Sequence, residues 1–342
     1  MNKARFSFSS SKADFYFNAR FSALSSLVEK KRTILLTDKN VFKYHKQKFA
    51  GWQTIVIKAG EKHKVQSTVD GVVGKLIEMK VDRTWTIIGV GGGVVTDLAG
   101  YIAAIFLRGI KVGFVPTTLL AMVDAAIGGK NGIDVGAYKN MVGTIRQPQF
   151  ILYDVSLLRS LPQKEWKNGF AEIIKHASIG STKMFRELQK NDLKFYQENG
   201  EAISSLIIQN AKLKIRVVQQ DEFETGNRKL LNFGHTLAHA IENNYALMHG
   251  QSVAIGMVAA AHFSEKLLGF KKSIELRSLI KKYGLPAQMS FDVNKVFDVM
   301  VNDKKRSGSE IDYILLREIG EAVIFKVPII KLKKMIGTIN KS

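Results

Sequence analysis

The chain of 342 residues contains no cysteine. This absence excludes disulfide bonds and catalysis by a thiolate, and it restricts the ligands of any bound metal to histidine, carboxylate groups and water. Long apolar runs are absent as well. The longest nearly apolar stretch, residues 253–263, is much shorter than the roughly 20 residues of a membrane-spanning helix. We therefore expect no membrane partner, and a reducing cytoplasm suits a chain without cysteine.

The N-terminus lacks the continuous apolar segment of a secretory signal. Its basic, serine-rich composition resembles that of transit peptides, but apolar and polar residues alternate in FSFSS (6–10) and FYFN (15–18). Alternation with a period of two is typical of half-buried strands. We therefore predict edge strands for this segment and a cytoplasmic protein.

Negative charge is scarce, because 51 lysine and arginine residues outnumber 30 aspartate and glutamate residues and give a net charge of +21. An excess of this size is typical of proteins that bind nucleic acid. However, the basic residues are spread along the chain. We find no zinc-finger spacing, no aromatic signature of an RNA-recognition domain and no basic region followed by heptads. We therefore predict solvated basic surfaces and no nucleic-acid partner.

The first 153 residues alternate strand and helix patterns. Short apolar runs predict strands at 33–37, 54–58, 85–90 and 112–115. Helical spacing of apolar residues predicts helices at 39–49, 65–79 and 94–107. This order favours a parallel sheet covered by helices, in which ligands collect at the carboxyl ends of the strands. The polar or glycine-rich residues at such ends are Asp38, Gly60, Glu61, Gly91–Gly93, Thr117 and Thr118.

Helical patterns dominate after about residue 154. The predicted helices cover 163–179, 183–189, 201–221, 236–245, 253–268, 274–282 and 330–339. A hairpin is expected at 312–316 and 322–327. We therefore predict two domains, an α/β Rossmann-like parallel-sheet domain over residues 1–153 and a mainly α-helical domain over residues 154–342.

A glycine-rich turn, GVGGGVVTD (89–97), follows the third predicted strand. The strict dinucleotide fingerprint G-x-G-x-x-G is not satisfied, because Val94 stands where the last glycine is required. Three consecutive glycines before a helix still allow a pyrophosphate to approach the backbone and the helix N-terminus. Taken alone, the glycines favour phosphate binding only slightly over a tight structural turn.

A second glycine-rich stretch carries Gly128, Gly129 and Lys130. Asn131 follows the lysine where a nucleotide-triphosphatase loop needs serine or threonine, so we reject that class of enzyme. The loop can still hold an anion through the charge of Lys130. Other polar residues, Asp124, Lys139 and Asn140, lie close by in the sequence. We therefore predict a site rather than a plain loop here.

Metal-type side chains occur in the second half of the chain. Glu172 and Lys175 are three residues apart in an apolar helical segment, and His235 and His239 have the i,i+4 spacing that places two imidazoles on one helix face. His249 follows on a separate segment. Spacing alone supports metal binding and ordinary core or surface histidines equally, and it leaves open which two histidines would be ligands.

The order of several longer motifs is specific. The motifs are GGGVVTDLAGYIA (91–103), RGI (108–110), PTTLLAMVDAAIGGKNGID (116–134), KNMVGTIRQP (139–148), LPQKEWKNGFAEIIK (161–175), NFGHTLAHAIE (232–242), HGQSVAIGM (249–257) and DKKRSG (303–308). Together they resemble the 3-dehydroquinate synthase family of sugar phosphate cyclases. The resemblance runs from about residue 33 to residue 327, which is nearly the whole chain.

The resemblance implies a dehydroquinate synthase-like fold, a tightly held NAD and one divalent metal, Zn²⁺ or Co²⁺. It also implies the substrate, 3-deoxy-D-arabino-heptulosonate 7-phosphate, and a place in the shikimate pathway. In this reaction NAD oxidises the C5 hydroxyl, phosphate leaves by β-elimination, the hydride returns to C5, and ring opening and an aldol step close the carbocycle. A substrate with a carboxylate and a phosphate requires cationic side chains.

The resemblance assigns a role to each matched position. The implied NAD-binding residues are Asp38, Asn40, Glu61, Lys64, Gly92, Gly93, Val94, Asp97, Thr117, Thr118, Lys130, Lys139, Leu157 and Ser160. The implied metal ligands are Glu172, His235 and His249. The implied catalytic and substrate-binding residues are Asp124, Lys130, Asn140, Lys175, Lys214, Arg228, Asn232, His239 and Lys304 or Lys305. Arg108 is implied to reach the substrate of a neighbouring subunit, so we expect a homodimer.

Two related activities were weighed against this one. A metal-dependent polyol dehydrogenase would lack one combination of residues, because its substrate carries no phosphate or carboxylate. The combination is Lys130, Lys139, Asn140, Lys214 and Arg228. Lys214 and His239 argue against a related cyclase of valiolone or aminocyclitol type, because carboxylate recognition should be relaxed there. The chain also departs from the usual family pattern without losing a metal ligand or a lysine, and the departures are Thr96, Tyr101, Ala125, Ala126, Ser160 and Gln251.

Overall fold

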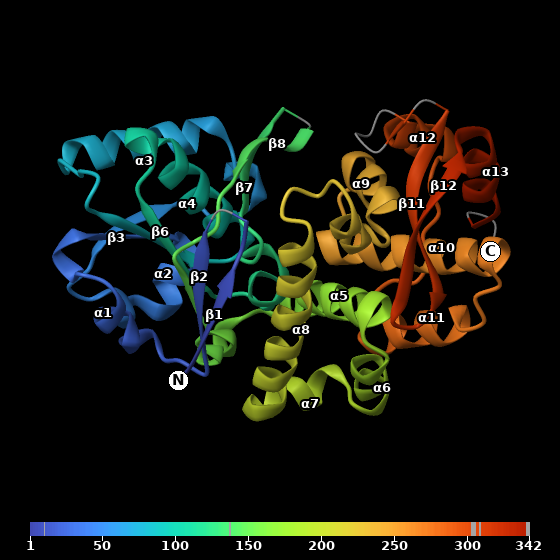
Figure 1. Cartoon of the computed structure of the whole chain (residues 1–342), viewed down its shortest axis with the longest axis horizontal. Coiled ribbons are helices and arrows are strands. Elements are labelled where there is room, and N and C mark those ends of the chain that lie inside the picture. The colour runs from blue at the N-terminus through green and yellow to red at the C-terminus, as the bar shows by residue number, and fades with distance from the viewer. Residues whose placement is uncertain (10, 137, 302–305, 308, 340–342) are drawn as a thin grey trace. The chain divides into compact units, whose positions relative to one another are not determined.

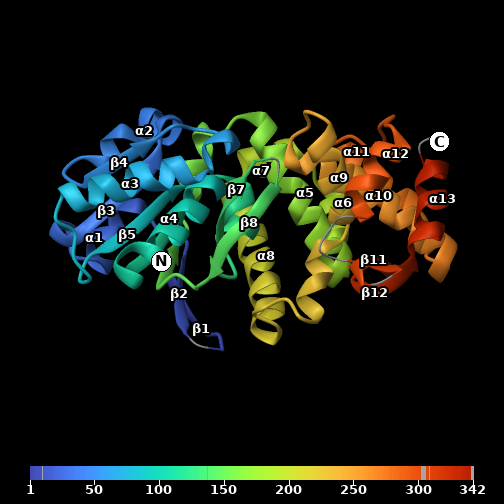
Figure 2. The same ribbon diagram turned by 90° about the horizontal axis from the view of Figure 1, so that it is seen from above.

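The computed structural model describes residues 1–9, 11–136, 138–301, 306–307 and 309–339 (Figures 1 and 2). The chain forms two compact units. The first comprises Met1–Glu165 and Gly200–Phe223, and the second comprises Trp166–Asn199 and Glu224–Ser342. Within the described part of the chain, no helix is both long and apolar enough to cross a bilayer.

A seven-stranded sheet forms the centre of the first unit, in the order β1-β2-β9-β6-β5-β3-β4. All neighbouring strands are parallel except β1 and β2, which form an antiparallel hairpin. This arrangement confirms the predicted parallel sheet. Both predicted N-terminal strands form, but only β1 is an edge strand, because β2 lies between β1 and β9. The strands are β1 (Asn2–Ser7), β2 (Lys12–Phe17), β3 (Thr33–Asp38), β4 (Gln53–Ile57), β5 (Thr86–Gly91), β6 (Lys111–Pro116) and β9 (Phe150–Leu152).

Helices cover both faces of this sheet, because alternate residues of the central strand β5 are buried on opposite faces. Ile88 and Val90 belong to a buried cluster that includes Leu24 and Phe49, from the segments around α1 (Leu24–Leu27) and α2 (Lys39–His45). Gly89, between them, faces Ala99 of α4 (Gly93–Ile105) instead. Figure 1 shows α4 on one side of the sheet and α1 and α2 on the other. Helix α3 (Gln66–Glu78) packs beside α4.

Three strands of the first unit were not predicted. β7 (Lys130–Val135) and β8 (Tyr138–Ile145) pair antiparallel where the sequence indicated an irregular polar stretch. Their glycines interrupt the apolar pattern, but Gly132 and Gly143 face each other and let the two backbones approach closely. β9 has only three residues, which is too short for a strand to be predicted from the period of its apolar residues. It forms because β2 and β6 pair with it on its two sides.

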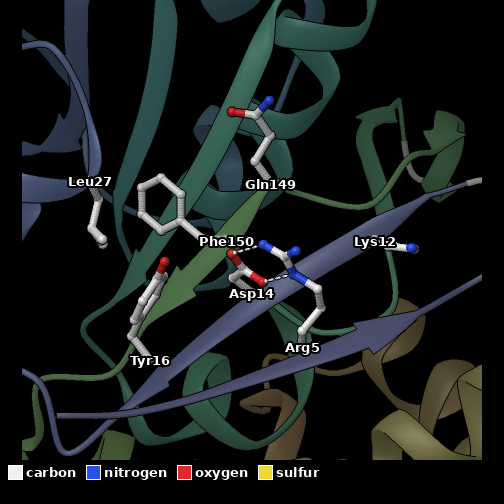
Figure 3. A pocket seen from close by; sticks show the side chains of 7 residues that line it. All are labelled: Arg5, Lys12, Asp14, Tyr16, Leu27, Gln149 and Phe150. Carbon is white, nitrogen blue, oxygen red and sulfur yellow. Dashed lines mark hydrogen bonds and ion pairs between the residues drawn. The ribbon is translucent and has the colours of Figure 1, made fainter.

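A shallow hollow lies where the β1–β2 hairpin joins β9 (Figure 3). Arg5 and Asp14 form an ion pair across the hairpin, and Tyr16 and Phe150 supply the apolar part of the lining. None of the residues that the motifs single out lines this hollow. We therefore regard it as a feature of the hairpin and not of the functional site.

The second unit is built around α10 (His249–Leu268), which packs against α9, α11 and β11. The hairpin of β11 (Glu310–Glu318) and β12 (Glu321–Pro328) confirms the prediction, and β10 (Arg306–Ser307) adds a short third strand. The helices are α5 (Gln163–Gly180), α6 (Thr182–Lys190), α7 (Leu193–Glu198), α9 (His235–Asn244), α11 (Ser273–Lys282), α12 (Val293–Val301) and α13 (Ile329–Ile339). Helices α7 and α12 were not predicted, because short segments present few turns of a pattern.

The division of the chain differs from the predicted boundary at residue 154. The first unit continues to Glu165, and α8 (Gly200–Gln220) belongs to it although the chain has already entered the second unit. Helix α8 packs against the short helix Ala121–Ala125, where Lys214 bonds to Asp124. A helical pattern shows that a helix forms but not which core its apolar face joins.

Candidate functional site

The glycine-rich turn of the first unit joins β5 to α4. A Cβ atom at Gly92 would lie 2.9 Å from Thr118 Cγ2, and a Cβ at Gly91 would overlap Val95. The amide of Thr117 donates to the carbonyl of Gly91 at 2.9 Å, which fixes the end of β6 beside the turn. Glycine is therefore required here for close backbone approach, and the predicted positions 92–94, Thr117 and Thr118 do come together.

This turn fits the phosphates of a dinucleotide. It opens a helix of thirteen residues at the carboxyl end of a parallel strand, where amide donors and the helix dipole favour an anion. Thr117 Oγ1 is buried and has no hydrogen-bond partner among the described residues. A buried hydroxyl without a partner is unfavourable, so a ligand that supplies one would stabilise the turn.

Lys64 connects the predicted cofactor site to the predicted substrate site. Its Nζ atom lies 2.5 Å from Asp97 Oδ2 on α4 and donates to Asn140 Oδ1 on β8 at 2.5 Å. Burial lowers the pKa of Lys64, but the charges of Asp97 and Glu61 outweigh burial and leave the pKa raised. Burial also raises the pKa of Asp97, against the opposing charge of Lys64. The lysine therefore stays cationic in a largely buried position.

A second lysine of the first unit is bound to the predicted substrate residue Asp124. Lys214 Nζ donates at 2.7 Å to both the side-chain Oδ1 and the backbone oxygen of Asp124. Lys214 is buried on α8, and Asp124 lies in the short helix Ala121–Ala125. The cation is thus placed by two oxygens of one residue.

The remaining predicted cofactor residues of the first unit have varied surroundings. Asp38 caps α2 by accepting from the amides of Asn40 and Val41 at 2.7 and 3.0 Å. Ser160 Oγ lies 2.7 Å from His45 Nε2. Leu157 is buried in the core cluster, so its side chain contributes to packing. The exposed positions are Asn40, Glu61, Lys130 and Lys139.

The second unit brings the three predicted metal ligands together. Glu172 lies in the middle of α5, whereas His235 and His249 are the first residues of α9 and α10. The Nε2 atoms of His235 and His249 lie 3.4 and 3.2 Å from Glu172 Oε1. Ligands at about 2.1 Å from a tetrahedral ion stand about 3.4 Å apart, so these three atoms fit a divalent ion such as zinc.

Two close backbone contacts hold these helices in place. The amide of Gly250 donates to the side chain of Asn168, and a Cβ at Gly250 would lie 2.7 Å from Asn168 Cα. This contact fixes the start of α10 against α5. A Cβ at Gly256 would lie 2.8 Å from the carbonyl carbon of Gly234, which precedes His235 with φ +79°. The glycines therefore set the positions of both histidines.

Each histidine ring is oriented by an acceptor at its second nitrogen. Nδ1 of His235 lies 3.2 Å from the carbonyl oxygen of Phe233, and Nδ1 of His249 lies 2.9 Å from Glu242 Oε1. Carbonyl and carboxylate oxygens only accept, so each Nδ1 donates its proton. Both Nε2 atoms are then left to face Glu172, as metal-ligating imidazoles require.

The charges of the site suit a cation. Burial raises the pKa of Glu172, but the charge of Lys175 and the two neighbouring histidines outweigh burial, so the pKa lies well below its usual value. Burial and the charge of Lys175 lower the pKa of His235 to about 4, which keeps its ring neutral. Burial also lowers the pKa of His249, but its hydrogen bonds to Glu172 and Glu242 prevail and raise it to about 10. A bound metal would take the place of that proton.

Other predicted substrate residues lie in the second unit. Lys175 pairs with Glu172 Oε2, and both side chains are buried. The His239 ring stands edge-on to that of His235, with the ring centroids 5.5 Å apart. Arg228 is buried, and Asn232 donates to Glu224 at 2.8 Å. Lys304 and Lys305 lie outside the described residues.

Sequence reasoning missed two residues of the metal site. Glu242 bonds to His249, and Asn168 bonds to the amide of Gly250. Glu242 could have been found from its spacing, because it follows His235 by seven residues and so lies on the same face of α9. Asn168 gives no such signal, since its partner lies 82 residues away in the sequence.

Family models and a curated relative match most of the chain. The family model of the 3-dehydroquinate synthase N-terminal domain matches residues 54–168, and the model of the C-terminal domain matches residues 169–306. A 3-dehydroquinate synthase of Bacillus pumilus is 42% identical over 277 residues, which cover 79% of this chain and 76% of that protein.

Solved structures of sugar phosphate cyclases share the fold. The 2-epi-5-epi-valiolone synthase of Streptomyces hygroscopicus, solved with NAD⁺ and Zn²⁺, has a TM-score of 0.87 at 24% identity, with 98% of this chain and 99% of that chain covered. A 2-deoxy-scyllo-inosose synthase, solved with carbaglucose-6-phosphate, NAD⁺ and Co²⁺, has a TM-score of 0.86 at 24% identity and the same coverage. The matched models and the identity to the Bacillus protein together show that the chain belongs to the 3-dehydroquinate synthase family.

Proposed function

We propose that this chain converts 3-deoxy-D-arabino-heptulosonate 7-phosphate to 3-dehydroquinate and inorganic phosphate, a step of the shikimate pathway. The observation that carries the proposal is the convergence of two imidazole Nε2 atoms on one buried carboxylate, Glu172, in a chain of this family. A carbon–oxygen lyase of this kind needs a site for a cation and a site for a dinucleotide, and the residues present fit both.

The proposed cofactors are NAD and one Zn²⁺ or Co²⁺ ion. The glycine turn at Gly92 and Gly93, with Thr117, would hold the pyrophosphate, and Glu172, His235 and His249 would hold the metal. When bound, NAD would accept and return the hydride at C5, and the metal would polarise the substrate oxygens. The related cyclases that were solved with NAD⁺ and Zn²⁺ or Co²⁺ support this choice.

The cationic side chains are proposed to recognise the two anionic groups of the substrate. Lys214 and Arg228 suit the carboxylate, because the guanidinium can donate two parallel hydrogen bonds. Lys130 and Asn140 suit the phosphate, with Lys304 or Lys305 as a further cation. Lys175, buried beside Glu172, is placed to donate a proton or a hydrogen bond to a substrate oxygen near the metal.

The assembly is proposed to be a homodimer in which Arg108 serves the neighbouring site. Arg108 is exposed on a turn where Leu107, Arg108 and Gly109 all have positive φ, a costly conformation for the first two residues. Arg146, which follows β8, donates from its Nη1 to the carbonyl of Ala103 just before this turn, at 2.8 Å. Large apolar side chains of this turn and of the β7–β8 segment are 40% to 67% exposed, namely Ile105, Leu107, Val135, Tyr138, Met141, Val142 and Ile145. An apolar surface of this kind, with an arginine among its residues, suits a partner subunit.

The proposal is tested by a phosphate-release assay with identification of the carbocyclic product. We expect release from the heptulosonate phosphate to require NAD, to stop when a strong chelator removes the metal, and to return when Zn²⁺ is restored. Glu172→Gln should bind no Zn²⁺ and release no phosphate, because it removes the only anionic ligand of the site. Glu265→Gln, on the exposed side of α10, serves as the matched control and should behave as the wild type.

The outcomes separate the parts of the proposal. Phosphate release that survives both chelation and Glu172→Gln would refute the metal assignment. Failure to form the carbocyclic product, with Zn²⁺ and NAD both bound, would refute the substrate. A polyol oxidised with net production of NADH would point instead to the dehydrogenase activity.

A further inference from the structure

Glu242 lies beside the metal site but is not one of its expected ligands. It occupies α9 seven residues after His235, so the two side chains lie on one face of the helix, two turns apart. The Oε1 atom of Glu242 accepts from Nδ1 of His249 at 2.9 Å. The carboxylate side chain is only 2% exposed. A single helix therefore supplies one ligand and contacts the ring of another.

We propose that Glu242 is a positioning residue that holds the His249 ring so that its Nε2 atom faces the metal position at Glu172. The inference rests on the metal site of the proposed function. Because the carboxylate can only accept, it fixes the proton on Nδ1 and leaves the lone pair on Nε2 for the ion. In this orientation of the ring, His249 Nε2 lies 3.2 Å from Glu172 Oε1.

The two histidines differ in what orients them. His235 donates to the backbone oxygen of Phe233 and follows the glycine contact between α9 and α10, so backbone atoms place it. The His249 side chain is 31% exposed and donates to a side chain instead. A partly exposed ring has more freedom to rotate, so the contact with Glu242 restricts the one ligand that burial does not fix.

The negative charge of the Glu242 carboxylate should strengthen metal binding beyond what a neutral acceptor would provide. Its negative charge strengthens the hydrogen bond from Nδ1 and makes Nε2 a better donor of electrons to a cation. Burial of a carboxylate is costly unless it is paired, and the imidazole N–H provides such a pairing. The loss of Glu242 should therefore weaken metal binding even though Glu242 does not touch the ion.

The test compares Zn²⁺ affinity in Glu242→Ala, Glu242→Gln and the control Glu265→Gln. Each full-length protein is stripped of metal, and its affinity for Zn²⁺ alone is measured by competition with a coloured chelator, without substrate. We expect Glu242→Ala to bind Zn²⁺ about 10- to 100-fold more weakly. Glu242→Gln should bind Zn²⁺ about 3- to 10-fold more weakly than the wild type, because its amide oxygen still accepts the hydrogen bond but carries no charge. Glu265→Gln should match the wild type.

A second measurement distinguishes positioning from general damage. The visible spectrum of bound Co²⁺ reports the ligands around the ion, and we expect it to change in Glu242→Ala and to stay closer to the wild type in Glu242→Gln. The metal-free form of Glu242→Gln should still unfold in a single cooperative transition, as the wild type does, which shows that the fold is intact. If Glu242→Ala does not fold, the glutamine variant decides the question alone.

Unchanged Zn²⁺ affinity in either Glu242 variant would overturn the inference, and the proposed reaction would stand. A wild-type protein that takes up no Zn²⁺ or Co²⁺ would overturn both the inference and the metal assignment. Weak Zn²⁺ binding in the Glu242 variants together with a wild-type protein that binds metal but forms no dehydroquinate would support the inference and refute only the proposed substrate.

Discussion

Lys64 and Asp97 form an ion pair whose side chains are only 5% and 17% exposed. Removing one partner of such a pair leaves an uncompensated charge, whereas replacing both partners by neutral groups often restores stability. The same two residues are proposed to bind NAD, so their effects on stability and on the cofactor have to be separated by experiment.

We expect Lys64→Met to lower the free energy of unfolding by about 3 kcal/mol, because Asp97 then stays buried without its partner. The double variant Lys64→Met with Asp97→Asn should recover more than half of that loss. Neither variant should retain NAD. Urea unfolding without cofactor and calorimetric titration with NAD provide the two measurements, and a single variant as stable as the wild type would contradict the role given to the pair.

The candidate metal ligands show which residues of the site could be predicted from the sequence alone. The resemblance identified Glu172, His235 and His249, and the structure places all three within reach of one ion. Spacing by itself placed His235 and His239 on one helix face but left open which two histidines would be ligands. His249 comes from another helix, and only the packing of α9 and α10 makes it the second nitrogen that faces Glu172. A helix reveals its own faces in the sequence, but not the helix it packs against.

Among the elements, the β1–β2 hairpin carries a cross-strand ion pair. Asp14 lies opposite Arg5 in the register and bonds to it at 2.6 and 2.9 Å, with Lys3 at 2.8 Å. The hydrogen bond from Arg5 lowers the pKa of Asp14 from 3.8 to about 2, against the opposing effect of burial. Figure 3 shows the pair at the edge of the sheet.

The pH dependence of this pair has a defined sign. Because the folded-state pKa is depressed, the stabilisation is fully present above about pH 4 and is lost as the pH falls through about 2. The side chains of Lys3 and Arg5 are roughly half exposed, so solvent screens the ion pairs. We expect the pairs to contribute at most about 1 kcal/mol to the free energy of unfolding. Asp14→Asn should therefore be less stable than the wild type at neutral pH by about that amount in urea unfolding. The difference should shrink towards pH 2 and with added salt, and a difference that grew in acid would contradict the assignment.

Helices α9 and α10 meet through glycine, and this contact gives a second prediction at the scale of elements. We expect Gly256→Ala to lower the free energy of unfolding by about 3 kcal/mol, because the new Cβ would overlap the backbone of Gly234. It should also weaken Zn²⁺ binding, because His235 follows Gly234 directly.

The matched control is Gly74→Ala, at a helical glycine of α3 where no atom lies within 4 Å of the added Cβ. Alanine is a better helix former than glycine, so this variant should be more stable by about 0.5–1 kcal/mol and should bind Zn²⁺ normally. Equal Zn²⁺ affinity in Gly256→Ala and the wild type would show that the contact does not place His235.

At the scale of the whole molecule, the proposed dimer predicts that two inactive variants complement each other. Arg108→Ala lacks the residue lent to a neighbour, and Glu172→Gln lacks a metal ligand of its own site. In a mixed dimer the site on the Arg108→Ala chain receives Arg108 from its partner and is complete. Random pairing on co-expression should therefore restore activity at about a quarter of all sites.

The measurement is phosphate release by purified, co-expressed chains, compared with each variant expressed alone. Activity near the sum of the two single variants would mean that Arg108 serves its own chain or that the protein is not a dimer. Sedimentation of the wild type gives the oligomeric state independently.

The sequence by itself determined the alternation of strands and helices, the glycine turn before α4 and the set of ionisable side chains that the proposed chemistry needs. These features are encoded locally, in the period of apolar residues and in short ordered motifs. The tertiary structure alone decided that α8 joins the first unit, that β9 lies between β2 and β6, and that Glu242 orients His249. Glu172 and His249 are 77 residues apart, and their contact depends on how the helices pack against each other. A local sequence pattern does not specify this packing.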